Sequence, residues 1–141
     1  MKPEKKKKIR ITEYLMHKAL TPPEAPSPYR FETGEDKVLI LGAFPDMQKE
    51  TAANWQLLGS FRLLPYTRDH TVYFYDFSIE EALRGQGLGT AVFPHILGYL
   101  YTCGYRNILL QVSDANPAAF SLYKNSGLTT GESVVHYEYV P

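Results

Sequence analysis

The sequence predicts an α/β (α+β) fold in which a mixed, mostly antiparallel central sheet is flanked by helices. Three apolar runs rich in aromatic and β-branched residues follow one another between residues 37 and 79. The spacing of apolar residues then changes to a repeat of four, which is typical of one buried helix face. A compact apolar run, a short helix and an alternating segment complete the pattern.

Length and composition indicate one globular domain spanning residues 1–141. Hydrophobic residues make up 44% of the chain, and 15 Lys+Arg balance 15 Asp+Glu, so no long-range attraction to nucleic acid or anionic lipid is expected. Residues 1–8 carry a lysine run and are expected to form a basic flexible tail. No segment approaches the ~18 apolar residues of a membrane span. With one cysteine and no secretion signal, the cytoplasm is the expected compartment.

The first third of the chain is the least regular part. Ile9 and Ile11 alternate like the start of a strand, and Glu13–Leu20 predicts a short helix. The segment 21–28, TPPEAPSP, predicts a surface loop, because proline removes an amide donor and fixes φ. The apolar runs 37–44, 55–65 and 70–79 then predict an antiparallel meander, with links at 45–54 and 67–69.

The second half predicts alternating helices and strands. A helix that ends near Gly104 is indicated by the repeat of Leu88, Val92, Ile96 and Leu100, although Pro94 interrupts its hydrogen bonding. The run 108–112 predicts a strand covered on both faces. A second helix is predicted over Pro117–Asn125, with Asn116 as N-cap and Gly127 as stop, and 134–140 as a final strand.

A glycine-rich loop at residues 84–90, RGQGLGT, lies between a predicted strand and a predicted helix. Glycines let the backbone approach a ligand closely, and free amides at a helix start favour an anion such as a diphosphate. The loop lacks the lysine of a Walker motif. Its glycines are spaced two apart, unlike the G-x-G-x-x-G fingerprint of dinucleotide-binding folds. Alone it is weak evidence, because a plain strand-to-helix turn would also use glycine.

Two motifs in the right order make the chain resemble the GNAT superfamily of N-acetyltransferases. Arg84, Gly87 and Gly89 match the acyl-CoA signature R/Q-x-x-G-x-G/A. A second signature, N-x-x-A-x-x-L-Y-x-x-x-G-F, is matched with leucine in place of the final phenylalanine by Asn116, Ala119, Leu122, Tyr123, Gly127 and Leu128. The stretch 104–112 and the glycine at position 59 also look family-like. The resemblance covers residues 37–140, and the segment 21–28 stands where the family has two helices that shape the acceptor site.

The resemblance implies acetyl-CoA as co-substrate, a GNAT-like sheet, and direct acetyl transfer to a primary amine of a small molecule or peptide. It implies Tyr123 as the general acid, although a tyrosine packed on its helix would look the same in sequence. The implied acetyl-CoA contacts are Phe77, Ser78, Ile79, Arg84, Gly85, Gln86, Gly87, Leu88, Gly89, Thr90, Asn116, Ala119 and Tyr123. Arg84 could instead brace its loop, and Asn116 could serve only as a helix cap.

Several assignments stay open. The general base could be Asp76, Tyr73, Tyr75, His70 or ordered water. Strand alternation places Asp76 opposite to both tyrosines. Cys103 is expected in the apolar stripe of its helix rather than as a nucleophile, and the histidines lack metal-ligand spacing, so no metal is implied.

No sequence pattern indicates the acceptor amine, the acyl-chain preference or the oligomeric state, and a homodimer is one of the open alternatives. A non-catalytic acyl-CoA-binding regulatory module of the same fold is the alternative function. A partner-binding domain with aromatic surface at Tyr137 and Tyr139 is a third.

Overall fold

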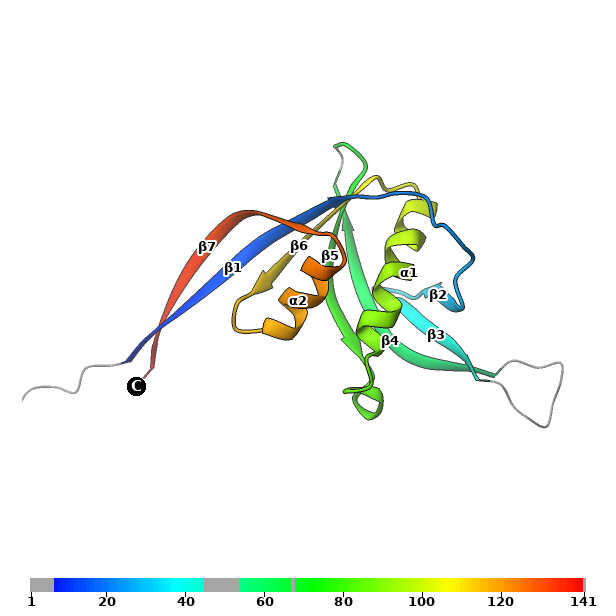
Figure 1. The fold of residues 1–141 in the computed structure, drawn as a ribbon, viewed down its shortest axis with the longest axis horizontal. Coiled ribbons are helices and arrows are strands. Elements are labelled where there is room, and N and C mark those ends of the chain that lie inside the picture. Colours follow the sequence, from blue (N-terminus) through cyan, green and yellow to red (C-terminus); the bar gives the residue numbers. More distant parts are fainter. Residues whose placement is uncertain (1–6, 45–53, 67, 141) are drawn as a thin grey trace, which may run out of the picture. The chain divides into compact units, whose positions relative to one another are not determined.

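The computed structural model describes residues 7–44, 54–66 and 68–140, with backbone only for 7–10, 44 and 134–140. Residues 1–6 of the expected tail 1–8, most of the expected link 45–54, and the side chains of Tyr137 and Tyr139 lie outside this description. Lys7 and Lys8 belong to the first strand, so the expected flexible tail is wrong for these two residues. The described strands are β1 Lys7–Ala19, β2 Tyr29–Thr33, β3 Val38–Phe44, β4 Asn54–Pro65, β5 Thr71–Ile79, β6 Asn107–Ser113 and β7 Thr129–Val140. The helices are the 3₁₀ helix η1 Glu81–Leu83, α1 Leu88–Thr102 and α2 Pro117–Asn125. Figure 1 shows these elements along the chain.

The chain forms two compact units, Ala19–Leu109 and Met1–Lys18 together with Leu110–Pro141. In the first unit, β2, β3, β4 and β5 pair with their sequence neighbours in antiparallel fashion. The start of β6 joins β5 in parallel, with Val72 opposite Ile108. The predicted mixed, mostly antiparallel sheet is therefore confirmed, and the three predicted meander strands correspond to β3, β4 and β5.

Aromatic side chains join α1 to this sheet. The Phe93 ring lies 5.6 Å from that of Phe74, and the Tyr99 ring stacks at 4.7 Å on Phe31 of β2. Phe61 of β4 is fully buried in the same layer. The predicted apolar face of α1 is confirmed for Val92, Ile96 and Leu100, whose side chains are fully buried, whereas Leu88 at its start is only half-buried. Burying each large apolar side chain contributes about 1.5–3 kcal/mol, so this layer holds α1 against the sheet.

α1 continues through Pro94 instead of ending there. Because proline carries no amide hydrogen, the carbonyl of Thr90 lacks the donor that normally lies four residues further along a helix. The helix ends at Thr102, and Gly104 follows with a left-handed φ of 102°, as the sequence predicts. Cys103 is exposed at the C-cap, so its expected place in the apolar stripe is wrong. The stripe stops at Leu100, one turn before it.

In the second unit, β1 pairs antiparallel with β7, from Lys7 opposite Val140 to His17 opposite Thr129. The predicted helix over Glu13–Leu20 is wrong, because these residues up to Ala19 continue β1. Pairing with a strand more than a hundred residues away supplies backbone hydrogen bonds that a short isolated helix could not match. The strand at 134–140 is confirmed within β7.

Capping determines the bounds of α2. The Asn116 side chain accepts a hydrogen bond from the Ala119 amide at 3.2 Å, Pro117 occupies the first turn, and Gly127 has φ 93°. The predicted cap, start and stop of this helix are all confirmed. The Phe120 ring packs edge-on against Tyr14 of β1 at 5.2 Å, which holds α2 on its unit.

The proline-rich segment 21–28 is an exposed loop, as predicted. It leads directly into β2, a strand that the sequence pattern did not indicate, and β2 pairs with β3 from Tyr29 opposite Gly42. The described residues between β1 and β3 therefore contain a loop and one strand in place of the two helices usual for the family. No helix within the described part of the chain is long and apolar enough to cross a membrane.

Candidate active site

The glycine loop connects η1 to the first turn of α1. Gly85 and Gly87 have φ values of 79° and 78°, which L side chains rarely adopt, and Gly87 is the N-cap of α1. A Cβ added at either glycine would meet no atom within 4 Å, so the space beside both is open. The glycines are needed for the backbone turn and not because the neighbouring chain crowds them.

The amides of this loop are the part of the site that an anion would meet. Among the described residues, no group accepts a hydrogen bond from the amides of Gly85 to Thr90, and no side chain caps α1. Unpaired amides at a helix start carry partial positive charge, which the aligned helix dipoles reinforce. This stretch is therefore a ready site for an anionic group.

Arg84 braces the loop against the end of β5. Its Nε donates a 2.9 Å hydrogen bond to the Ile79 carbonyl, and its amide donates to the Glu81 carbonyl. Arg84 therefore braces its loop, as the alternative considered from the sequence expected. The loop and the end of β5 are held as one piece by this bond.

The end of β5 lies unusually close to β4 at Gly59. A Cβ at Gly59 would come within 2.3 Å of the Ser78 carbonyl oxygen, so no other residue fits there without moving β5. Glu80 donates its amide to the Leu58 carbonyl at 2.8 Å, directly after Ile79. These contacts position the backbone of Phe77, Ser78 and Ile79.

A β-bulge interrupts β5 just before that segment. Ser60 lies opposite Ser78 and Arg62 opposite Tyr75, so two residues of β5 face the single residue between them on β4. Asp76 takes a left-handed φ of 52° within this bulge. A bulge leaves ladder groups unpaired and redirects the side chains that follow.

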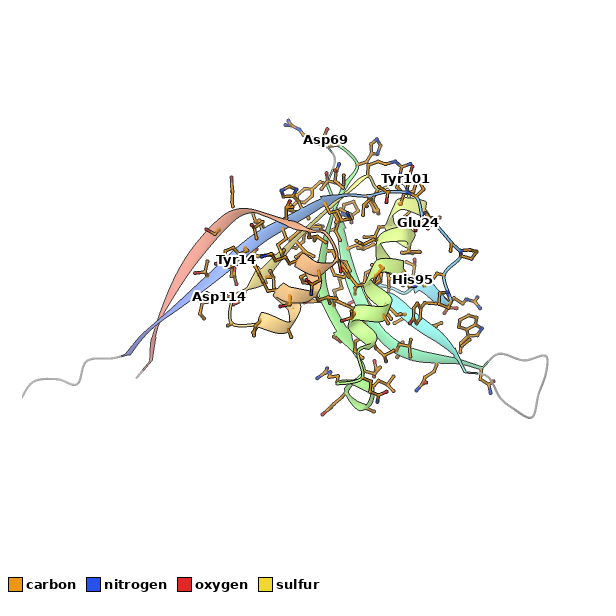
Figure 2. All side chains as sticks on the ribbon, viewed as in Figure 1. Tyr14, Glu24, Asp69, His95, Tyr101 and Asp114 are labelled. Atoms are coloured by element: carbon orange, nitrogen blue, oxygen red, sulfur yellow. The ribbon has the colours of Figure 1, made fainter. Side chains whose placement is uncertain are left out.

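The candidate bases lie in different surroundings. The Asp76 carboxylate is exposed and forms an ion pair with Arg62, 3.6 Å from its Nε. His70 lies in the turn directly before β5. The nine residues of β5 separate His70 from Ile79, which is a distance of roughly 30 Å. Figure 2 labels its neighbour Asp69 at that turn. Tyr73 and Tyr75 stack on each other at 5.7 Å on one face of β5.

Tyr123 is on α2 and is 9% exposed. Burial raises the pKa of Tyr123 to about 12, because the ionised phenolate loses water solvation. The side chain therefore keeps its proton at neutral pH. Asn116 and Ala119 are joined by the capping bond of the same helix.

The structure thus brings the implied acetyl-CoA contacts together in two groups. Residues 77–79 and 84–90 form one continuous piece of the unit Ala19–Leu109, linked by the Arg84 bond. The other unit holds Asn116, Ala119 and Tyr123 on one helix. In the described residues no cluster of three or more His, Cys, Asp or Glu side chains has the arrangement of a metal site.

Sequence reasoning missed a cleft of about 370 Å³ at the start of α1. Gln86 and Leu88 belong to the predicted loop, but most of the lining comes from β2, β3 and β4. No motif indicated it, because β2 was not predicted and its partners are adjacent only through strand pairing. The one available signal was Gly42, a glycine inside an apolar strand pattern.

The chain matches one known protein family over most of its length. The profile of the Acetyltransferase (GNAT) family matches residues 14–128, which is most of the chain. The chain belongs to the GNAT acetyltransferase family. In this family context, the two motifs at residues 84–89 and 116–128 fall inside the matched range.

Relatives and solved structures agree with this membership. Ribosomal protein bS18-alanine N-acetyltransferase of Escherichia coli is 27% identical over 103 residues, which cover 70% of this chain and 68% of the relative. Mycothiol acetyltransferase of Amycolatopsis mediterranei is 38% identical over 63 residues, covering 45% of this chain and 21% of that protein.

Among solved structures, a GCN5-related N-acetyltransferase from Sphaerobacter thermophilus superposes with a TM-score of 0.62 at 14% identity. The match covers 96% of this GNAT chain and 53% of the other, so the chain spans about half the length of that structure. A protein assigned as a streptothricin acetyltransferase from Bacillus anthracis, solved with acetyl coenzyme A, has a TM-score of 0.51 at 15% identity, covering 98% and 89% of the two chains.

Proposed function

We propose that this GNAT protein is an acetyl-CoA-dependent N-acetyltransferase that moves the acetyl group directly to a primary amine. The observation that carries the proposal is the run of amides from Gly85 to Thr90 at the start of α1, which meet no acceptor within the described part of the chain. The space beside Gly85 and Gly87 is open, so a diphosphate can approach the backbone there. The structural relative solved with acetyl coenzyme A supports the choice of co-substrate.

The acetyl group is assigned to the end of β5. In this proposal a backbone amide among Phe77, Ser78 and Ile79 donates to the thioester oxygen and stabilises the negative charge that develops there. A fixed amide aimed at developing charge is among the largest single catalytic contributions. The bulge at Asp76, the close approach at Gly59 and the Arg84 bond to Ile79 support this role, because they hold that backbone in one arrangement.

The reaction then needs two proton movements. The neutral amine nitrogen attacks the thioester carbonyl carbon, a C–N bond forms, and the C–S bond breaks. The departing CoA sulfur takes a proton from the Tyr123 hydroxyl, and the proton lost from the acceptor nitrogen goes to solvent, from which Tyr123 is reprotonated. The motif position of Tyr123 supports this assignment, and its raised pKa keeps the phenol protonated and ready to donate.

The acceptor must lose one proton before it attacks, since an ordinary primary amine has a pKa near ~10.4. Asp76 is exposed and ion-paired, and His70 lies at the far end of β5. We therefore assign deprotonation to water, and we take the hydroxyls of Tyr73 and Tyr75, whose rings stack on one face of β5, as candidates for ordering that water. The Escherichia coli relative acetylates an alanine of a ribosomal protein by its name, which supports an amine on a peptide as acceptor.

Thiol release from acetyl-CoA in the presence of a panel of amines tests the proposal. We expect CoA to appear only when an amine is added, with one acetylated product per thiol. Calorimetric titration with CoA serves as the binding control. A protein that binds CoA but releases none with any amine would be the acyl-CoA-binding regulatory module, and a protein that binds no CoA at millimolar concentration would contradict both readings.

A further inference from the structure

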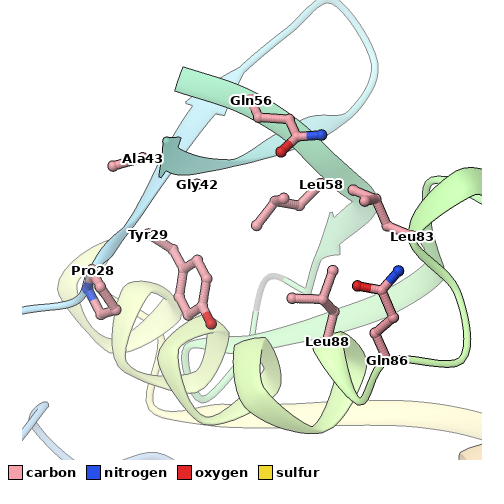
Figure 3. A pocket seen from close by; sticks show the side chains of 9 residues that line it. All are labelled: Pro28, Tyr29, Gly42, Ala43, Gln56, Leu58, Leu83, Gln86 and Leu88. Carbon is pink, nitrogen blue, oxygen red and sulfur yellow. The ribbon is translucent and has the colours of Figure 1, made fainter. Parts of the chain in front are cut away.

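A cleft at the start of α1 is built entirely within the unit Ala19–Leu109, and its volume is about 370 Å³ (Figure 3). Its lining residues are Pro28, Tyr29, Gly42, Ala43, Gln56, Leu58, Leu83, Gln86 and Leu88. These come from the loop before β2, from β2, β3, β4 and η1, and from the glycine loop. The cleft therefore depends on β2, the strand that replaces the helices usual for the family.

Two local features keep this space open. The β3–β4 register shifts next to Leu58, because Ile40 lies opposite Gly59 and Leu41 opposite Leu57. The extra residue, Leu58, is buried and forms one wall. A Cβ on Gly42 would come within 2.8 Å of the Leu58 Cδ1 atom, so the missing side chain at Gly42 gives Leu58 its room.

The lining combines apolar walls with neutral hydrogen-bonding groups. Figure 3 shows the amides of Gln56 and Gln86 and the ring of Tyr29 around the space beside Leu58 and Leu88. Neither glutamine amide has a hydrogen-bond partner among the described residues, and no lining side chain is charged. The Tyr29 ring also makes an edge-on contact with the His95 ring, with centroids 5.2 Å apart.

The cleft shares residues with the glycine loop and is joined to the end of β5 by a backbone hydrogen bond. Gln86 and Leu88 belong to the loop assigned to the diphosphate, and the Leu58 carbonyl accepts the amide of Glu80, the residue after Ile79. A molecule in the cleft therefore lies next to the end of β5. We propose that this cleft binds the acceptor, and that the acceptor is the amino-terminal segment of a peptide; this rests on the proposed acetyltransferase function.

Hydrogen-bond chemistry favours a peptide over a polyamine or an aminoglycoside. A glutamine side chain carries one acceptor and two donors, which match the N–H and C=O of a peptide group. The leucine walls can cover the aliphatic side chain of the second or third residue of such a segment. A polycation entering the cleft would lose water without meeting a carboxylate, which is costly.

The test uses the full chain, acetyl-CoA and three probes: alanyl-leucyl-alanine amide, spermidine and kanamycin. We expect acetylation of the tripeptide amide at its amino terminus and little with the two polycations. Gln56→Leu removes one amide without changing volume much, and Tyr29→Phe removes one hydroxyl while keeping the contact with His95. Each variant is expected to raise the peptide KM about tenfold and to leave the acetyl-CoA KM unchanged.

Matched controls are available outside the cleft. Gln111→Leu changes an exposed glutamine of β6 that bonds to Glu13, and Tyr101→Phe changes a tyrosine near the other end of α1. Both should keep the wild-type peptide KM, and thermal melts check that all four variants fold.

Three results would overturn the inference. Acetylation of spermidine or kanamycin but not the peptide would leave the acetyltransferase proposal standing and reject the peptide acceptor. A rise in the acetyl-CoA KM instead of the peptide KM would assign the cleft to the co-substrate. Absence of CoA binding would reject the proposed function itself, and the acceptor site with it.

Discussion

Phe77 packs against Phe74, with ring centroids 5.7 Å apart, although strict strand alternation would place these two residues on opposite faces of β5. The bulge at Asp76 explains the contact, because one extra residue shifts every later side chain to the other face. Phe77 consequently joins Phe93 of α1 at 6.1 Å in the buried aromatic layer. The bulge thereby ties the proposed acetyl-binding backbone to the helix that begins at the glycine loop.

The bulge makes a prediction about Asp76. Asp and Asn tolerate a left-handed φ better than β-branched residues do. Asp76→Val should therefore destabilise the fold by about 1–3 kcal/mol and lower kcat, because residues 77–79 lose their alignment. Asp76→Asn should cost under about 1 kcal/mol, since it removes only an exposed ion pair with Arg62. Urea unfolding and steady-state kinetics measure both, and equal effects of the two substitutions would contradict the role of the bulge.

The glycine loop makes a second prediction, and Gly104 provides its control. Gly87 and Gly104 lie at opposite ends of α1 and both have left-handed φ values. A Cβ added at either glycine would meet no atom within 4 Å. Alanine at either position should cost about 1 kcal/mol of stability from backbone strain. Only Gly87→Ala should also weaken CoA binding, by about tenfold or more, because it displaces the amides around the helix start. Calorimetry with CoA measures this, and parallel loss in Gly104→Ala would show a general folding effect.

The third prediction concerns Tyr123 as proton donor. Tyr123→Phe keeps the buried ring but removes the hydroxyl, so kcat should fall about 100-fold while the acetyl-CoA KM stays near the wild-type value. Thiol-release kinetics at saturating acetyl-CoA measure it. Phe120 is a neighbour on α2 that packs on Tyr14, and Phe120→Leu should affect stability more than kcat. An unchanged kcat in Tyr123→Phe would assign the tyrosine to packing alone.

Burial of Tyr123 also predicts alkaline instability. The folded pKa is raised to about 12, above the usual tyrosine value near ~10, so the folded state holds this proton more tightly. The contribution is fully present below about pH 10 and is lost as pH rises toward 12, amounting to roughly 2–3 kcal/mol. Unfolding curves of the wild type and Tyr123→Phe should diverge over this window, with the wild type losing more. Parallel curves would contradict the raised pKa.

Much of the fold was predictable because local signals and tertiary packing agree. The α2 bounds follow from Asn116, Pro117 and Gly127, and the apolar repeat of α1 is the face that meets the sheet. The glycine motif could be recognised from the sequence because the left-handed turn at Gly87 needs glycine whatever surrounds it.

The failures in the strands share one physical cause, which is dependence on distant strands. Residues 13–19 look helical alone, yet they pair with β7, and β2 exists only because Tyr29 to Thr33 meet β3. No sequence pattern indicates the bulge at Asp76, because the pairing of β5 with β4 determines the register. The cleft beside Gly42 needs all of these pairings at once, so no local pattern could have indicated it.

Pro94 divides the backbone ladder of α1 into a short opening segment and a longer remainder. With the Thr90 carbonyl lacking its usual donor, the opening segment is joined to the remainder by one bond fewer than in an ordinary helix. Fraying there costs less free energy than fraying around Ile96 and Leu100, whose side chains are sealed in the core. Hydrogen–deuterium exchange should therefore be fastest in the stretch assigned to the diphosphate, and a bound anion should slow it.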